Sequence, residues 1–205
     1  MIVIVDYGTA NIGSVLSMGL KAGGQLRISA DPDEVAAADK LILPGVGAFD
    51  HGMANLHDRG LAAALNHAVL ERKVPILGIC LGVQLFTRGS EEGKLPGLGW
   101  IAADTVKFRF DQTAPDLKVP HMGWNHVTPA KDDPLLVALP VDPRFYFVHT
   151  YHLVCDDEKD VLTWTQHGHR FASSVSHGNI WGTQFHPEKS HKFGLAMMRN
   201  FSNLP

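Results

Sequence analysis

The segment that most constrains the fold of this chain is the pentapeptide Gly78-Ile79-Cys80-Leu81-Gly82. It joins an apolar run over residues 74–79 to a helical pattern over residues 81–87, which predicts a strand, a sharp turn and a helix. Glycines two positions before and two after the cysteine keep side chains away from the neighbouring backbone in so tight a turn. The arrangement matches the G-x-Ser-x-G nucleophile elbow with cysteine in place of serine, and predicts a strained, outward-pointing Cys80.

Short apolar runs alternate with helical patterns in the first half of the chain. We expect strands at residues 2–5, 40–43 and 74–79, and helices at 11–21, 52–72 and 81–87. This alternation predicts an α/β fold with a largely parallel central sheet flanked by helices, because strands covered on both faces have unbroken apolar runs. Each of these strands ends in a glycine-containing turn, at the carboxyl edge where active sites form in such sheets.

The second half of the chain is rich in β-like segments. They cover residues 100–110, 144–151, 161–165, 171–176 and 180–184, and should extend and flank the parallel sheet. A last helix should begin after Ser190 as N-cap and run to about Phe201. Since there is no repeat, low-complexity run or linker, residues 1–205 are expected to form a single domain.

The charge and cysteine content exclude several classes of function. The formal net charge is -3, with 18 basic and 21 acidic residues intermixed, so neither a basic stripe for nucleic acid nor a polybasic helix for a membrane is present. Two cysteines in a chain of this size favour a reduced, cytoplasmic setting. The apolar N-terminal run of five residues is too short for a signal peptide or a membrane span.

Two interpretations of Cys80 compete. Free cysteine is among the most buried residue types, which by itself favours a structural role. The elbow reverses this preference, because a core cysteine needs no flanking glycines, and the amino end of a helix lowers a cysteine pKa through its dipole and free amides. Cys155 lies in no such setting and keeps the structural interpretation.

A cysteine nucleophile needs a general base and a group that orients the base, and the segment from Gln184 to Glu188 supplies both. If residues 180–185 form a strand, His186 lies at its end. Two-residue spacing in an extended segment then places Glu188 on the same face. His186 would move the proton while Glu188 fixes its tautomer.

Other histidines are less informative, because the chain contains 12 of them. The pairs His149, His152 and His167, His169 could suggest a metal site, but neither has an established zinc-ligand spacing. We therefore expect no metal and no cofactor.

Hydrolysis of an amide through a thioester also requires donors for an oxyanion. The backbone amide of Leu81 should be one of them, and the second should come from the turn Pro44-Gly45-Val46-Gly47. By itself this turn is equally consistent with an ordinary strand ending.

Three segments together resemble the class I glutamine amidotransferases: residues 44–49, residues 78–84 and His186-Pro187-Glu188-Lys189. Residues 120–125 and 146–151 are most similar to the glutaminase subunits of imidazole glycerol phosphate synthases, and the similarity runs from Met1 to the C-terminal helix. The resemblance implies that Cys80 attacks the side-chain amide of glutamine, that His186 protonates the departing ammonia, and that water then releases glutamate.

The resemblance also implies roles that the residues alone do not reveal. Val46 supplies a mobile oxyanion amide, and the positions that hold glutamine are Gly47, Gln84, Thr150 and Tyr151. A docking surface for a (β/α)8-barrel cyclase, which uses the ammonia in histidine biosynthesis within a heterodimer, would include Asn11, Trp124, Tyr146 and Lys189. Each of the four docking residues could instead be an ordinary surface residue. Gln84 could likewise be an amide on the surface of a helix.

Two departures keep alternatives open. The first turn is Gly8-Thr9-Ala10-Asn11, where the family has a second glycine. Residues 189–194 resemble a paralogous group that feeds ammonia to a sugar-modifying synthetase in surface polysaccharide biosynthesis. A different elbow-cysteine hydrolase, such as a peptidase or γ-glutamyl hydrolase, and a non-catalytic binding module are the remaining alternatives.

Overall fold

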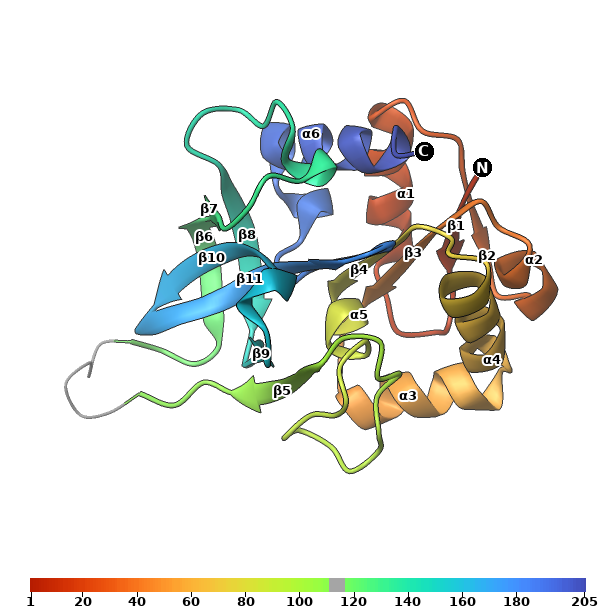
Figure 1. The fold of residues 1–205 in the computed structure, drawn as a ribbon, viewed down its shortest axis with the longest axis horizontal. Helices are drawn as coiled ribbons and strands as arrows, with labels where there is room; N and C mark the ends of the chain where they lie inside the picture. Colours follow the sequence, from red (N-terminus) through yellow and green to blue (C-terminus); the bar gives the residue numbers. More distant parts are fainter. Residues whose placement is uncertain (111–116) are drawn as a thin grey trace.

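A computed structural model describes residues 1–110 and 117–205, and its centre is a ten-stranded sheet (Figure 1). The parallel part has the order β2-β1-β3-β4-β12. Its strands are β1 (Ile2–Val5), β2 (Leu26–Ser29), β3 (Lys40–Gly45), β4 (Ile76–Cys80) and β12 (Ile180–Thr183). The largely parallel α/β sheet predicted from the alternating pattern is therefore confirmed.

The β-rich second half continues this sheet in antiparallel fashion. From β12 the order is β11, β10 and β7, while β9 pairs with both β11 and β5. The bounds of these strands are β5 (Ala103–Lys107), β7 (Thr128–Pro129), β9 (Tyr151–Cys155), β10 (Val161–His167) and β11 (His169–His177). A separate two-stranded sheet is formed by β6 (His121–His126) and β8 (Arg144–His149).

Helices cover both faces of the parallel strands, as Figure 1 shows. On one face lie α1 (Ile12–Lys21) and α6 (His191–Ser202); on the other lie α2 (Pro32–Ala36), α3 (Phe49–Asp58), α4 (Leu61–Asn66) and α5 (Leu81–Gln84). Along β1, Val3 and Val5 enter the core cluster under α3 and α4, whereas Ile2 and Ile4 enter the cluster under α1 and α6. Burial on both faces explains why this strand has no polar alternation.

Several element boundaries differ from the expected ones. The strand β2 and the helix α2 were not predicted. The helix expected over residues 52–72 is divided into α3, α4 and a π-helical turn η1 (His67–Glu71), because Gly60 adopts φ +69° between the first two. The β segment over residues 144–151 is two strands, and α5 is a single turn rather than a helix to Thr87.

Ser190 precedes α6, as predicted, but its hydroxyl does not cap the helix. It donates to the carbonyl of His186 over 2.6 Å and accepts from the amide of Tyr146 over 3.0 Å. Contacts with β8 and with His186, which precedes the short 3-10 helix η4 (Pro187–Lys189), therefore take the place of the cap. Two further 3-10 turns are η2 (Pro134–Leu136) and η3 (Glu158–Asp160).

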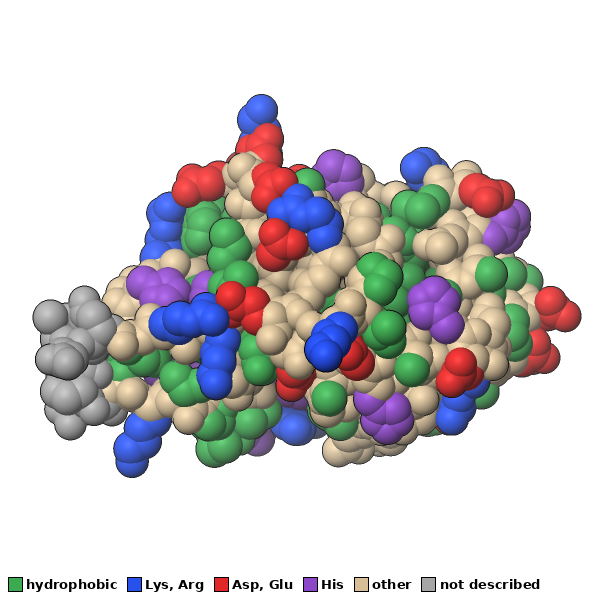
Figure 2. Space-filling view, turned by 90° about the horizontal axis from the view of Figure 1, so that it is seen from below, with side chains coloured by type: hydrophobic (Ala, Val, Ile, Leu, Met, Phe, Trp, Pro, Cys, Tyr) green, Lys and Arg blue, Asp and Glu red, His purple; other side chains and the backbone are tan. Residues whose placement is uncertain are grey.

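Acidic and basic side chains are interspersed over the face seen in Figure 2, in agreement with the intermixed charges of the sequence. Among residues 1–110 and 117–205, every helix is too short or too polar to cross a lipid bilayer.

Candidate active site

The carboxyl ends of three neighbouring parallel strands meet at one edge of the sheet. The middle strand, β4, ends at Cys80, which stands in register with Gly45 at the end of β3. On its other side β4 pairs with β12, where Thr183 is opposite Ile79, so the chain after β12 passes beside the elbow. Segments far apart in the sequence therefore contribute the Val46 turn, Cys80 and His186 to one place.

The turn at Cys80 has the strained conformation that the elbow pattern predicts. Cys80 has φ 55° and ψ −109°, a region that non-glycine residues rarely occupy. A methyl group on Gly82 would overlap the carbonyl of Leu43, and one on Gly78 would meet Phe86 and the amide of Val83. The helix α5 that follows the elbow has only one turn.

His186 and Glu188 form the expected pair. His186 Nδ1 lies 2.7 Å from Glu188 Oε1, and the two side chains are only 2% and 4% exposed. The geometry differs from the predicted one, because Glu188 belongs to η4 rather than to an extended segment. The compact turn bends the carboxylate back to the ring, while the amide of His186 donates to the carbonyl of Tyr146 over 2.9 Å.

Burial lowers the pKa of His186, but the Cys80 sulfur and the Glu188 carboxylate outweigh that effect and raise the pKa to about 9. Nδ1 is occupied by Glu188. Nε2 is buried and makes no hydrogen bond to any described residue. Because His186 and Cys80 line the same cavity, Nε2 is the ring atom available for proton exchange with the thiol or with a substrate.

A cavity of about 330 Å³ opens in front of Cys80. Its lining includes all four residues predicted to hold glutamine and both predicted oxyanion residues, namely Gly47, Gln84, Thr150, Tyr151, Val46 and Leu81. Glu92 also lines it, although no sequence pattern distinguished this residue, and its carboxylate accepts from the amide of Phe49 over 2.9 Å. The cavity is large enough for a small polar substrate.

Gln84 is buried, so the interpretation of its side chain as a helix-surface amide is wrong. Its Nε2 donates to Gln184 Oε1 over 3.0 Å and to the carbonyl of Tyr151 over 3.3 Å. Gln184 in turn donates to the Cys80 sulfur over 3.7 Å. Gln184 was not predicted as a site residue, although it lies two positions before His186.

The two candidate oxyanion donors differ in whether their amide is already engaged in a hydrogen bond. The amide of Leu81 begins α5 and is outside the intrahelical hydrogen-bond ladder. The amide of Val46 donates to the carbonyl of Thr9 over 2.7 Å. An amide engaged in this way cannot at the same time donate to an anion in the cavity.

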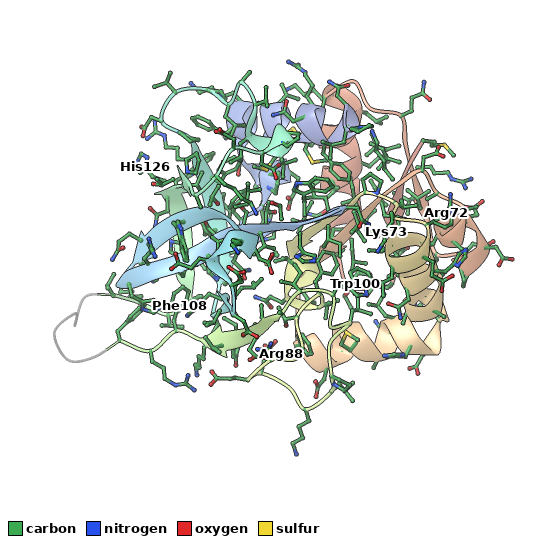
Figure 3. All side chains as sticks on the ribbon, in the orientation of Figure 1. Arg72, Lys73, Arg88, Trp100, Phe108 and His126 are labelled. Carbon is green, nitrogen blue, oxygen red and sulfur yellow. The ribbon has the colours of Figure 1, made fainter. Side chains whose placement is uncertain are left out.

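Behind the cavity, histidine rings surround Phe108, which is labelled in the β-rich half in Figure 3. They belong to His121, His149, His152, His167 and His169. Burial lowers the pKa of His121 and of His152 to about 4. Within the described part of the chain, no group of three or more His, Cys, Asp or Glu side chains has an arrangement that could hold a metal ion.

Neutral rings allow a directional chain of hydrogen bonds to the cavity. Asn125 Nδ2 donates to His121 Nε2 over 3.1 Å, and His121 Nδ1 lies 2.9 Å from His149 Nε2. His149 Nδ1 lies 2.7 Å from the carbonyl oxygen of Tyr151. Because a carbonyl oxygen can only accept, His149 Nδ1 must be the donor. The chain ends on the same carbonyl that Gln84 contacts.

Three of the residues predicted to lie at a partner interface form one surface patch. Trp124 on β6 is 46% exposed and stands opposite Tyr146 on β8, and Lys189 Nζ lies 5.9 Å from the centre of the Tyr146 ring. His191 stacks on Trp124 with ring centroids 5.5 Å apart. Asn11 is exposed at the start of α1, a helix that packs against η4.

The chain is similar to known proteins over nearly its whole length. The model of the family "Glutamine amidotransferase class-I" matches residues 3–203. The chain is 51% identical over 201 residues to the imidazole glycerol phosphate synthase subunit HisH 2 of Methanococcus maripaludis, covering 98% of both chains. It is 47% identical over 204 residues to the subunit HisH 2 of Pseudomonas aeruginosa, covering 100% of both.

Similar folds occur among solved structures. The structure of PurLQS from Thermotoga maritima aligns with a TM-score of 0.73 at 19% identity, covering 98% of this chain and 97% of that one. The glutaminase domain of Trypanosoma brucei CTPS with bound acivicin aligns with a TM-score of 0.65 at 15% identity, covering 100% and 94%. At these identities the likeness concerns the fold alone.

Proposed function

This chain belongs to the class I glutamine amidotransferases, and on that basis we propose that it is the glutaminase subunit of an imidazole glycerol phosphate synthase, with Cys80, His186 and Glu188 as its catalytic triad. The observation that carries the triad is the meeting of Cys80 and His186 in one cavity, with Glu188 bonded to the far side of the ring. Full-length relatives with subunit names support the assignment to this synthase.

The proposed reaction begins when the Cys80 thiolate attacks the side-chain amide carbon of glutamine. The carbonyl π electrons move to the oxygen, and the amide of Leu81 is placed to stabilise this oxyanion. As the carbon–nitrogen bond breaks, His186 gives a proton to the departing nitrogen, and ammonia and a thioester result. His186 then removes a proton from water, which attacks the thioester and releases glutamate and the thiol.

Glutamine recognition is assigned to four residues that line the cavity. Gly47 lies in the turn after β3, Gln84 lies on α5, and Thr150 and Tyr151 lie at the junction of β8 and β9. Because the Gln84 amide is already bonded to Gln184 and to the Tyr151 carbonyl, we assign it the role of holding these groups in position.

The ammonia is proposed to pass to a cyclase subunit of (β/α)8-barrel architecture. The docking surface would include Asn11, Trp124, Tyr146 and Lys189. An exposed tryptophan beside a tyrosine is typical of the anchors of protein interfaces.

A second candidate partner is a sugar-modifying synthetase of surface polysaccharide biosynthesis. Residues 189–194 resemble that paralogous group, and one of them, His191, stacks on Trp124 within the proposed docking surface. Both candidates use the same glutaminase chemistry.

The experiment that tests the chemistry is trapping of a Cys80 thioester during turnover of glutamine, with short peptides as competing substrates. Acylation of Cys80 by glutamine alone supports the proposal, and acylation by peptides would assign the chain to another class of hydrolase. Co-purification of the untagged partner then distinguishes the two candidates by mass. A Cys80→Ala complex should still synthesise product when ammonium salts at elevated pH replace glutamine.

A further inference from the structure

The Val46 amide can serve the oxyanion only after the peptide group between Gly45 and Val46 rotates. It now donates to the carbonyl of Thr9 over 2.7 Å, away from any anion bound to Cys80. Gly45 tolerates the change in its ψ angle, because it has no side chain. A methyl group on Gly45 would collide with the Tyr7 hydroxyl, so this strand end lies directly against Tyr7.

Rotation of a planar peptide group exchanges its two polar atoms. When the Val46 amide turns toward the cavity, the Gly45 carbonyl turns toward Thr9, where the Thr9 carbonyl already stands. Two buried acceptors then face each other, and the rotated state is unfavourable unless a donor reaches the Gly45 oxygen.

Two buried hydroxyl groups lie at this position without an assigned role. Tyr7 is fully buried, and Thr9 is 8% exposed. Neither Tyr7 Oη nor Thr9 Oγ1 has a hydrogen-bond partner among the described residues. Both residues lie beside the Gly45–Val46 peptide, because a methyl group on Gly45 would collide with Tyr7 Oη and the Thr9 carbonyl accepts from the Val46 amide. Burial raises the pKa of Tyr7, and the nearby Thr9 side chain partly offsets that effect. Buried hydroxyls without partners are rare, and each calls for an explanation.

We propose that Thr9 and Tyr7 are positioning residues that stabilise the rotated, oxyanion-competent state of the Val46 peptide. Thr9 Oγ1 donates to the Gly45 carbonyl after rotation, and Tyr7 Oη donates to Thr9 Oγ1. In the resting state the Thr9 carbonyl accepts from the Val46 amide. Thr9 therefore stabilises the resting state through its carbonyl and the rotated state through its hydroxyl. The inference rests on the proposed glutaminase function and identifies how its oxyanion site is assembled.

The test uses the complex of the full chain with its co-expressed partner, saturated with the partner's substrate. Thr9→Val keeps the shape and removes the hydroxyl, so we expect the kcat for glutamine hydrolysis to fall about 10-fold, with KM changed less than about 2-fold. Thr9→Ser restores the hydroxyl and should restore kcat. Tyr7→Phe should lower kcat by a smaller factor, and Tyr7→Phe added to Thr9→Val should cause little further loss, because Tyr7 acts through Thr9.

A second measurement is independent of turnover. An aldehyde analogue of glutamine adds to Cys80 and forms a thiohemiacetal whose oxygen needs the same donors, so Thr9→Val should weaken its inhibition about 10-fold. Alkylation of Cys80 by iodoacetamide needs no oxyanion donor and should be unchanged. Equal kcat and equal aldehyde inhibition in wild type and Thr9→Val would overturn the inference, as would failure of Thr9→Ser to restore them. A wild-type complex that does not hydrolyse glutamine would instead refute the proposed function.

Discussion

The amide of Val46 and the carbonyl of Thr9 are joined by a 2.7 Å hydrogen bond that links the first turn of the chain to the turn after β3. In this state one of the two expected oxyanion donors is engaged elsewhere. A missing oxyanion donor lowers kcat by roughly 100- to 1000-fold.

We therefore expect a low glutaminase rate for the isolated chain and a rate about 100- to 1000-fold higher for the complex loaded with the partner's substrate. Loading must then favour the rotated state by roughly 3 to 4 kcal/mol. Steady-state rates of the isolated chain, the empty complex and the loaded complex provide the check. Similar rates in all three would exclude control through this peptide and leave the triad chemistry untouched.

The two cysteines should differ sharply in reactivity. A glutamine-analogue electrophile should label Cys80 alone, because burial raises the pKa of Cys155 to about 12 and leaves it a thiol. Cys80→Ala should abolish hydrolysis while the thermal unfolding temperature and partner binding are retained. Peptide mapping by mass spectrometry identifies the labelled residue, and Cys155→Ser serves as the matched control with full activity. Labelling of Cys155 at a comparable rate would contradict the assignment.

Glu188→Gln should change the pH dependence of the reaction. His186 must carry a proton to release ammonia, so kcat should fall as the pH rises through its pKa of about 9. Since the Glu188 carboxylate raises this pKa, its replacement should move the basic limb of the profile to lower pH and reduce kcat by about 100-fold or more. The measurement is kcat between pH 6 and 10 for both proteins. An unshifted basic limb would show that another group sets it.

The same pair has a consequence for stability. The Cys80 sulfur and the Glu188 carboxylate hold the folded-state pKa of His186 above its unfolded value of 6.5, so the stabilisation that they give is fully present below pH 6.5 and is lost as the pH rises through 9. Urea unfolding of wild type and Glu188→Gln at pH 6 and pH 9.5 should show a difference that is larger at the lower pH.

Gly82→Ala should destabilise the fold, because its methyl group would overlap the carbonyl of Leu43, a backbone atom that cannot move independently of β3. We expect a loss of about 3 kcal/mol or more in the free energy of unfolding. Gly13→Ala is the matched control: nothing lies within 4 Å of the added group, and alanine in α1 should stabilise by about 0.5 to 1 kcal/mol. Denaturant unfolding of both variants tests the contrast, and equal stabilities would contradict it.

The histidines around Phe108 should make the fold sensitive to acid. Burial lowers the pKa of His152 to about 4 from 6.5, so the unfolded chain takes up the proton more readily. The stabilisation that each of these neutral histidines gives is fully present above pH 6.5 and is lost as the pH is lowered toward 4. At pH 5 the free energy of unfolding should be lower by about 2 kcal/mol for each of His121 and His152. His152→Gln removes one proton site and should reduce the difference in unfolding free energy between pH 7.5 and pH 5. An unchanged difference would mean that His152 is not responsible.

Local pattern was sufficient for much of this protein. The glycines at positions 78 and 82 predicted the elbow, because the residues that must lack a side chain in this turn are only two positions away from Cys80 in the sequence. The unbroken apolar runs predicted a covered parallel sheet, because β1 buries both of its faces. The pair His186 and Glu188 was also predicted, since the two residues are close in sequence, although the reason offered, an extended segment, was wrong.

Tertiary structure decided what depends on distant segments. The partner of the Val46 amide, the burial of Gln84 against Gln184, and the gathering of histidines around Phe108 all join residues that are far apart in the sequence. The Ser190 hydroxyl bonds to β8 and to His186 rather than to its own helix. A sequence pattern shows which groups can donate or accept, but the choice among partners follows from which backbone atoms burial brings within about 3 Å.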